Sequence, residues 1–178
     1  MSSSSSEQVL ISVLRQLGTD RVPHGRRALL DHLAGTCRLL RKWGCADPVC
    51  RAGLFHSVYG TNAFEVAALT HLQRPQVRKL IGEDAERLAY LFSVIERPGA
   101  LLRALRSGRA TNRLTGESHA LERDTLHALI EIECANLVEQ GAGGAFLREL
   151  APALLAGDFP QSLVESVAGF AGPTAAGV

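Results

Sequence analysis

The chain has 178 residues, 46% of them apolar, which is long enough to bury the core of one domain. Its 19 basic and 18 acidic side chains nearly cancel, leaving a formal charge of +1. This balance provides no electrostatic basis for a nucleic-acid partner or for binding to an acidic membrane. We therefore expect one domain that binds a small-molecule substrate in a pocket. The oligomeric state stays open, and a homo-oligomer is one alternative.

Cysteine usage and the N-terminus indicate a reduced, cytoplasmic protein. The four cysteines form no C-x-x-C pair, and the serine-rich start has neither the basic residues nor the apolar run of a signal peptide. No later segment contains the roughly 18 unbroken apolar residues that a membrane span needs.

Helical periodicity recurs along the whole sequence. Residues 1–6 are expected to be a disordered polar tail, 7–168 the domain, and 169–178 a flexible tail. Apolar spacing and turn residues predict helices over about 7–17, 26–43, 48–59, 63–72, 75–82, 84–95, 98–107, 121–140, 145–156 and 161–168. Polar connections are expected at 19–25 and 109–118. Because no strand-like alternation or internal repeat is present, we predict a compact, single-domain, all-α helical bundle.

Two histidines lie on the inward faces of neighbouring predicted helices. His32 follows Leu29 by three residues, on or beside an apolar stripe. His56 follows Ala52 by four and Gly53 by three, and a glycine at that position allows close approach of another helix. Both imidazoles are therefore expected to be buried.

The predicted helix 121–140 also carries polar residues on its apolar face, namely Glu133 and Asn136. An unpaired buried polar group costs about 1–3 kcal/mol, so these two residues and the two histidines should share one network. Such a network is either a functional site or a structural clasp, and its distribution over three helices favours a site.

These residues resemble the core of the HD-domain metal-dependent phosphohydrolases. The resemblance rests on the spacing from His32 to His56, on AGLFHS at 52–57 and on ECANL at 133–137, and it spans roughly residues 23–140. It implies a helical bundle in which a histidine, a His-Asp pair and a distant aspartate bind one or two metal ions.

The sequence departs from that family at two expected ligands. Ser57 stands where the aspartate of the pair is expected, and Asn136 stands where the last aspartate is expected. The resemblance then implies at most one divalent ion (Fe, Mn or Zn) on His32, His56 and His24, or none if the site is fully degenerate. Glu133 could restore one carboxylate ligand or act as a general base.

The segment FHSVYGT at 55–61 also resembles a signature of a family of uncharacterised domains. Tyr59 follows His56 by three residues, so its hydroxyl could enter the same cavity. We accordingly expect His56, Glu133 and Tyr59 to be catalytic.

A polar loop and two neutral residues are candidates for substrate binding. Arg109 and Arg113 could hold an anionic group, and Ser57 and Asn136 could contact the substrate. Three functions stay open: a mononuclear metal-dependent hydrolase, a metal-free acid–base enzyme (isomerase, lyase or cyclase), and a non-catalytic binding or scaffolding domain.

Overall fold

The computed structural model describes residues 3–171 and confirms the predicted all-α fold. The helices are α1 (Ser3–Gln16), α2 (Leu29–Trp43), α3 (Asp47–Phe55), α4 (Arg74–Ile81), α5 (Glu83–Val94), α6 (Gly99–Ser107), α7 (Arg123–Gln140), α8 (Gly144–Ala156) and α9 (Gln161–Ala171), with a 3-10 turn η1 at His71–Gln73. Two antiparallel hairpins pair β1 (Pro23–His24) with β2 (Arg27–Ala28) and β3 (Arg109–Thr111) with β4 (Ser118–Ala120).

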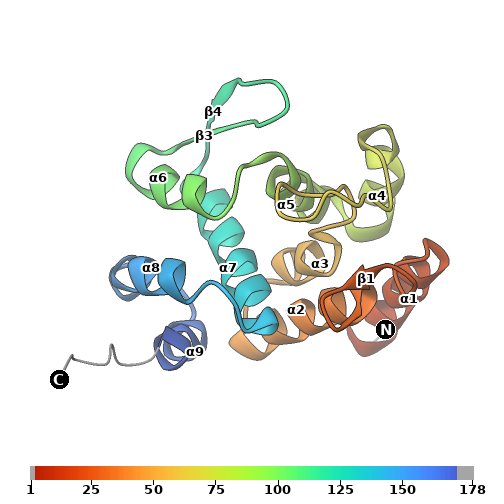
Figure 1. Cartoon of the computed structure of the whole chain (residues 1–178), viewed down its shortest axis with the longest axis horizontal. Helices are drawn as coiled ribbons and strands as arrows, with labels where there is room; N and C mark the ends of the chain where they lie inside the picture. The colour runs from red at the N-terminus through yellow and green to blue at the C-terminus, as the bar shows by residue number, and fades with distance from the viewer. Residues whose placement is uncertain (1–2, 172–178) are drawn as a thin grey trace.

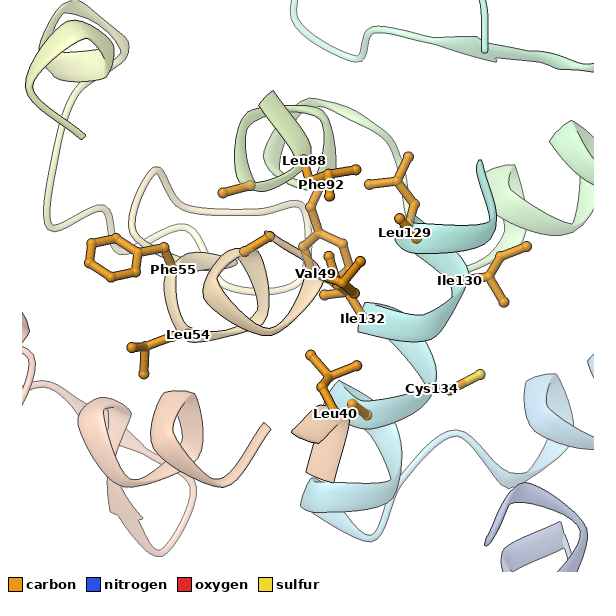
Figure 2. Packing of buried hydrophobic residues seen from close by; sticks show 14 of the residues in the cluster. Leu40, Val49, Leu54, Phe55, Leu88, Phe92, Leu129, Ile130, Ile132 and Cys134 are labelled. Carbon is orange, nitrogen blue, oxygen red and sulfur yellow. The ribbon is translucent and has the colours of Figure 1, made fainter. Parts of the chain in front are cut away.

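Helix α7 runs through the middle of the bundle, with α2, α3 and α5 on one side and α8 and α9 beside its C-terminal half (Figure 1). It contains no glycine or proline, and Gly141 ends it in the left-handed conformation at φ +66°. Leu129 and Ile132 lie towards α3 and α5, whereas Ile130 and Cys134 lie on the opposite side (Figure 2). Because both sides are buried, α7 also carries polar residues in the interior, among them Glu133 and Asn136.

The turn between α2 and α3 brings their two histidines together. Gly44 ends α2 at φ +79°, and Pro48 lies in the first turn of α3, so α3 folds back along α2. A Cβ atom at Gly53 would lie 2.2 Å from the Leu40 side chain, so the glycine permits this close approach. The two helices thus hold His32 and His56 at their contact.

Several predicted boundaries are wrong. Residues 3–6 belong to α1 rather than to a tail, and α9 extends to Ala171; residues 1–2 and 172–178 lie outside the described part. The expected helix at 63–72 is absent apart from the η1 turn. The polar stretches 19–25 and 109–118 contain hairpin strands, because turn glycines with positive φ (Gly25 and Gly116) reverse the chain there.

Cys37, Cys45, Cys50 and Cys134 are free cysteines, and all of them except Cys45 are buried. In the described part of the chain, no helix combines the length and apolar character needed to cross a membrane.

Candidate functional site: a buried histidine cluster beside a cleft

His32 on α2 and His56 at the end of α3 meet in the interior. Their Nε2 atoms are 3.2 Å apart, and the two rings are nearly perpendicular. Both side chains are essentially inaccessible to solvent, with residue exposures of 0% and 1%. The prediction that these histidines share one buried cluster is confirmed.

Asn136 completes this cluster from α7. Its Oδ1 atom lies 3.1 Å from His32 Nε2 and also accepts a 2.7 Å hydrogen bond from Nε2 of Gln140, one helical turn later. The bond from Gln140 assigns the oxygen, rather than the amide nitrogen, to the side that faces His32. We call His32, His56 and Asn136 the histidine cluster.

Both histidines are held through their Nδ1 atoms. His56 Nδ1 donates to the carbonyl oxygen of Gly53 at 2.6 Å, and His32 Nδ1 donates to Glu139 Oε2 at 2.5 Å. Burial lowers the pKa of His32, although the hydrogen bond that His32 donates to Glu139 opposes this effect. Burial also lowers the pKa of His56 well below the usual value. In the neutral rings the protons are on Nδ1, so both Nε2 atoms carry lone pairs.

The consequence is a convergence of acceptors. His32 Nε2, His56 Nε2 and Asn136 Oδ1 each present a lone pair within one small volume. Acceptors repel one another unless a proton or a cation lies between them. This arrangement can therefore hold a shared proton or a metal ion.

Glu139 orients His32 and was not predicted from the sequence. Its carboxylate fits against α2 because residue 35 is glycine: a Cβ there would lie 2.2 Å from Glu139 Oε1. Arg27 on β2 pairs with the same Oε2 atom that accepts from His32, and it also donates to the backbone oxygen of Glu139. The hairpin and the histidine cluster are thereby joined through one carboxylate.

His24 on β1 covers the cluster instead of joining it as a third ligand. Its ring stacks on His32 with centroids 4.4 Å apart and an 18° interplanar angle, and it also meets the ring of Phe64 edge to face. Among residues 3–171, no three His, Cys, Asp or Glu side chains are grouped so as to hold one metal ion. The predicted three-histidine ligand set is not formed in this arrangement.

A cleft of about 500 Å³ opens on the outer side of His24. It lies between the β1–β2 hairpin and residues from two distant segments. Its lining consists of Pro23, His24, Gly25, Arg26, Arg27, Phe64 and Gln140. Two lining residues contact the histidine cluster directly: His24 stacks on His32, and Gln140 donates to Asn136.

Glu133 is buried, but the structure does not bring it to the cluster as a ligand or base. Its carboxylate pairs with the guanidinium of Arg97, which lies 3.7 Å from the centre of the Phe92 ring. The Phe92 ring also contacts His56 edge to face, so it touches both the Arg97 guanidinium and the histidine. Sequence spacing identified the burial of Glu133 but not its partner.

Tyr59 belongs to a second buried polar cluster. Its hydroxyl donates to Glu86 Oε1 at 3.1 Å, and Arg74 donates to both carboxylate oxygens of Glu86. Burial and the Glu86 charge raise the pKa of Tyr59. We call Tyr59, Arg74 and Glu86 the Glu86 clasp; the predicted catalytic role of Tyr59 at the histidines is not supported by this placement.

The predicted substrate-binding arginines also point elsewhere. Arg109 donates to the Ser118 carbonyl within the β3–β4 hairpin, and Arg113 donates to the Ser93 carbonyl. Both line a separate cleft of about 90 Å³. Ser57 is buried next to His56, and within the described residues no hydrogen bond joins its hydroxyl to the histidine cluster. Arg26 and Arg27 take the place that was expected for Arg109 and Arg113.

Comparison with known protein families gives a match to part of the chain. Residues 13–97 are similar to a family described as a domain of unknown function (DUF6817). The matched segment contains His24, His32 and His56 but ends before Asn136 and Glu139. No curated protein and no solved structure matches the chain.

Proposed function

We propose that this protein is a small-molecule enzyme of the hydrolase type that uses one divalent metal ion held by His32, His56 and Asn136. The observation that carries the proposal is the convergence of two imidazole lone pairs and one amide oxygen in a buried volume. The resemblance to HD-domain phosphohydrolases supports it, because these residues follow the order of metal-binding positions in that family.

The geometry of the donor set fits a single ion. Two atoms 3.2 Å apart, like the two Nε2 atoms, can both lie about 2.0–2.1 Å from one metal. Metal-binding histidines usually donate their second N–H to a carboxylate or a carbonyl, as His32 does to Glu139 and His56 does to Gly53. Because the three ligands are neutral, the site suits one Fe, Mn or Zn ion rather than a pair.

The residues of the chain have separate tasks in this proposal. A divalent ion at the cluster would supply Lewis-acid polarisation to an oxygen of the substrate. Glu139 keeps the proton of His32 on Nδ1, and Arg26 and Arg27 attract the substrate into the cleft. His24 shields the cluster from water, so its ring must shift when a substrate reaches the histidines.

A metal-free acid–base enzyme is the second candidate, and one specific observation favours it. A proton on His32 Nε2 would donate to His56 Nε2 and to Asn136 Oδ1, and it would satisfy the cluster without a metal. This candidate predicts an activity that survives chelation, whereas the leading proposal predicts that chelation abolishes it.

The test is calorimetric titration of chelator-treated protein with Mn²⁺, Zn²⁺ and, under anaerobic conditions, Fe²⁺. We expect one ion per chain, loss of binding in His32→Ala and His56→Ala, and at least tenfold tighter binding in Asn136→Asp because it restores a carboxylate. His127→Ala is the matched control. His127 lies on α7, like Asn136, but its ring stacks on Phe159. Absence of binding to the wild type, or full binding by His56→Ala, would contradict the proposal.

A second assay connects binding to chemistry. A panel of small esters, amides and phosphate esters is incubated with the protein with and without EDTA. Hydrolysis that EDTA stops and that His56→Ala lacks supports the proposal. Turnover that is unchanged by EDTA supports the metal-free candidate instead.

A further inference from the structure

The tip of the β1–β2 hairpin carries an exposed arginine, Arg26, which lines the cleft. Pro23 pairs with Ala28 and His24 with Arg27, so Gly25 and Arg26 form a two-residue turn, and Gly25 has the positive φ of +63° that this turn requires. Arg26 is exposed at the cleft and forms no ion pair with any residue of the described part. The hairpin fixes the backbone position of Arg26, and the guanidinium is not neutralised by a carboxylate of the described residues.

The charged lining residues, together with the carboxylate that pairs with Arg27, sum to one positive charge. Arg26 and Arg27 contribute two, and the Glu139 carboxylate behind Arg27 removes one. Among the described residues, no acidic side chain lines the cleft itself. A ligand with one negative charge would complete the balance. A doubly charged ligand would leave one negative charge unpaired, and its desolvation cost rises with the square of its charge whereas its attraction to the cleft only doubles.

The lining of the cleft also contains two aromatic rings. Phe64 and His24 meet edge to face with centroids 4.9 Å apart, and Pro23 lies on the same lining. Such a corner provides flat apolar surface for an unsaturated ring. The volume of about 500 Å³ lies in the usual range for small-molecule sites.

We infer that this cleft binds a small carboxylate whose negative charge pairs with Arg26 and whose flat, unsaturated body packs against Phe64 and His24. A planar carboxylate accepts two parallel N–H bonds from a guanidinium, which gives both affinity and orientation. The inference deepens the proposed function by naming the substrate class, and it rests on that function only for the identity of the ligand as the substrate.

Three related probes distinguish charge from shape. Benzoate carries one charge, phenyl phosphate carries close to two at neutral pH, and benzamide has the same ring without charge. Their binding is measured by ligand-detected NMR and calorimetry in the presence of EDTA, with the full chain. We expect benzoate to bind, phenyl phosphate to bind at least threefold more weakly, and benzamide at least tenfold more weakly.

Variants of the chain locate the site. Arg26→Ala should weaken benzoate binding at least tenfold, with partial recovery in Arg26→Lys, and Phe64→Ala should weaken it about threefold. Arg21→Ala is the matched control because Arg21 is an exposed arginine of the same segment that does not line the cleft. Its affinity should equal that of the wild type.

The inference is overturned if benzoate does not bind, if benzamide or phenyl phosphate binds as tightly as benzoate, or if Arg21→Ala and Arg26→Ala have equal effects. These results do not depend on metal, because EDTA is present throughout. A protein that binds benzoate but no metal would retain this inference and lose the proposed function. A protein that binds metal but no carboxylate would retain the proposed function and lose this inference.

Discussion

The histidine cluster and the Glu86 clasp are both buried and polar, but their donors and acceptors are balanced differently. In the clasp, a fully buried carboxylate receives hydrogen bonds from Tyr59 and from two nitrogens of Arg74. In the histidine cluster, three acceptors face one another, and the N–H groups of both rings are directed outwards to Gly53 and Glu139.

This difference separates a structural interaction from a candidate site. A group of donors and acceptors that satisfy one another holds elements together and requires nothing else. A group of converging lone pairs is incomplete until a proton or a cation joins it. The cleft provides a second distinction, since it borders the covering residue of the histidine cluster. The comparison predicts that mutations in the Glu86 clasp mainly lower the free energy of unfolding, whereas mutations in the histidine cluster mainly weaken metal binding.

The largest expected effect is on stability, at the clasp. Glu86→Ala leaves the Tyr59 hydroxyl and the Arg74 guanidinium without their shared acceptor, so we expect a loss of about 3 kcal/mol in the free energy of unfolding. Urea denaturation measures this loss. Metal and benzoate binding per folded molecule should not change, and a change in either would show that the clasp takes part in the site.

The next effect is on metal affinity, at the residue that orients His32. Glu139→Gln replaces the carboxylate by a neutral amide, and we expect a 10- to 100-fold weaker affinity, equivalent to about 1.4–2.7 kcal/mol. Calorimetric titration measures it, with the exposed Glu149→Gln on α8 as the control. Equal affinities of the wild type and Glu139→Gln would remove Glu139 from the metal-binding account.

Acidification should destabilise the histidine cluster in chelator-treated protein. Burial, and then the neighbouring His32, hold the pKa of His56 well below 6.5, so the unfolded chain binds more protons than the folded one as the pH falls below 6.5. His56 therefore lowers the free energy of unfolding by about 1 kcal/mol between pH 6.5 and 5.5. Urea denaturation at both pH values should show a smaller decrease for His56→Asn, and identical decreases would contradict this assignment.

The smallest effect is expected at Gly35. An added Cβ would lie 2.2 Å from Glu139 Oε1, so Gly35→Ala should displace the carboxylate from His32 and weaken metal binding by less than tenfold. The double variant Gly35→Ala/Glu139→Ala tests the cause. If the clash is responsible, adding Gly35→Ala to Glu139→Ala should have no further effect on affinity.

The core of the site could be predicted from the sequence because its residues break an apolar pattern. His32, His56 and Asn136 each interrupt a helical face that must be buried, and the fold brings these faces together. Tyr59 was misassigned because the chain turns immediately after α3. Spacing of three residues therefore no longer placed its side chain beside His56.

The surroundings of the cluster could not be predicted in the same way. Glu139 and Gln140 lie at the end of α7, where charged and polar residues are normally solvated, and only the contact with Gly35 shows that Glu139 is enclosed. The β1–β2 hairpin has strands of two residues, which are too short for an alternating pattern. The cleft arginines depend on that hairpin, so they were missed with it.

X-ray absorption spectroscopy of the zinc-loaded protein tests the central claim most directly. The account predicts one zinc ion per chain with two imidazole nitrogens at about 2.0–2.1 Å. Any zinc that still binds to His56→Ala should have one imidazole ligand instead of two. Glu86→Ala, measured at a temperature where it is folded, should give the wild-type spectrum. Zinc bound without imidazole ligands, or with a coordination shell unchanged in His32→Ala and His56→Ala, would contradict the account.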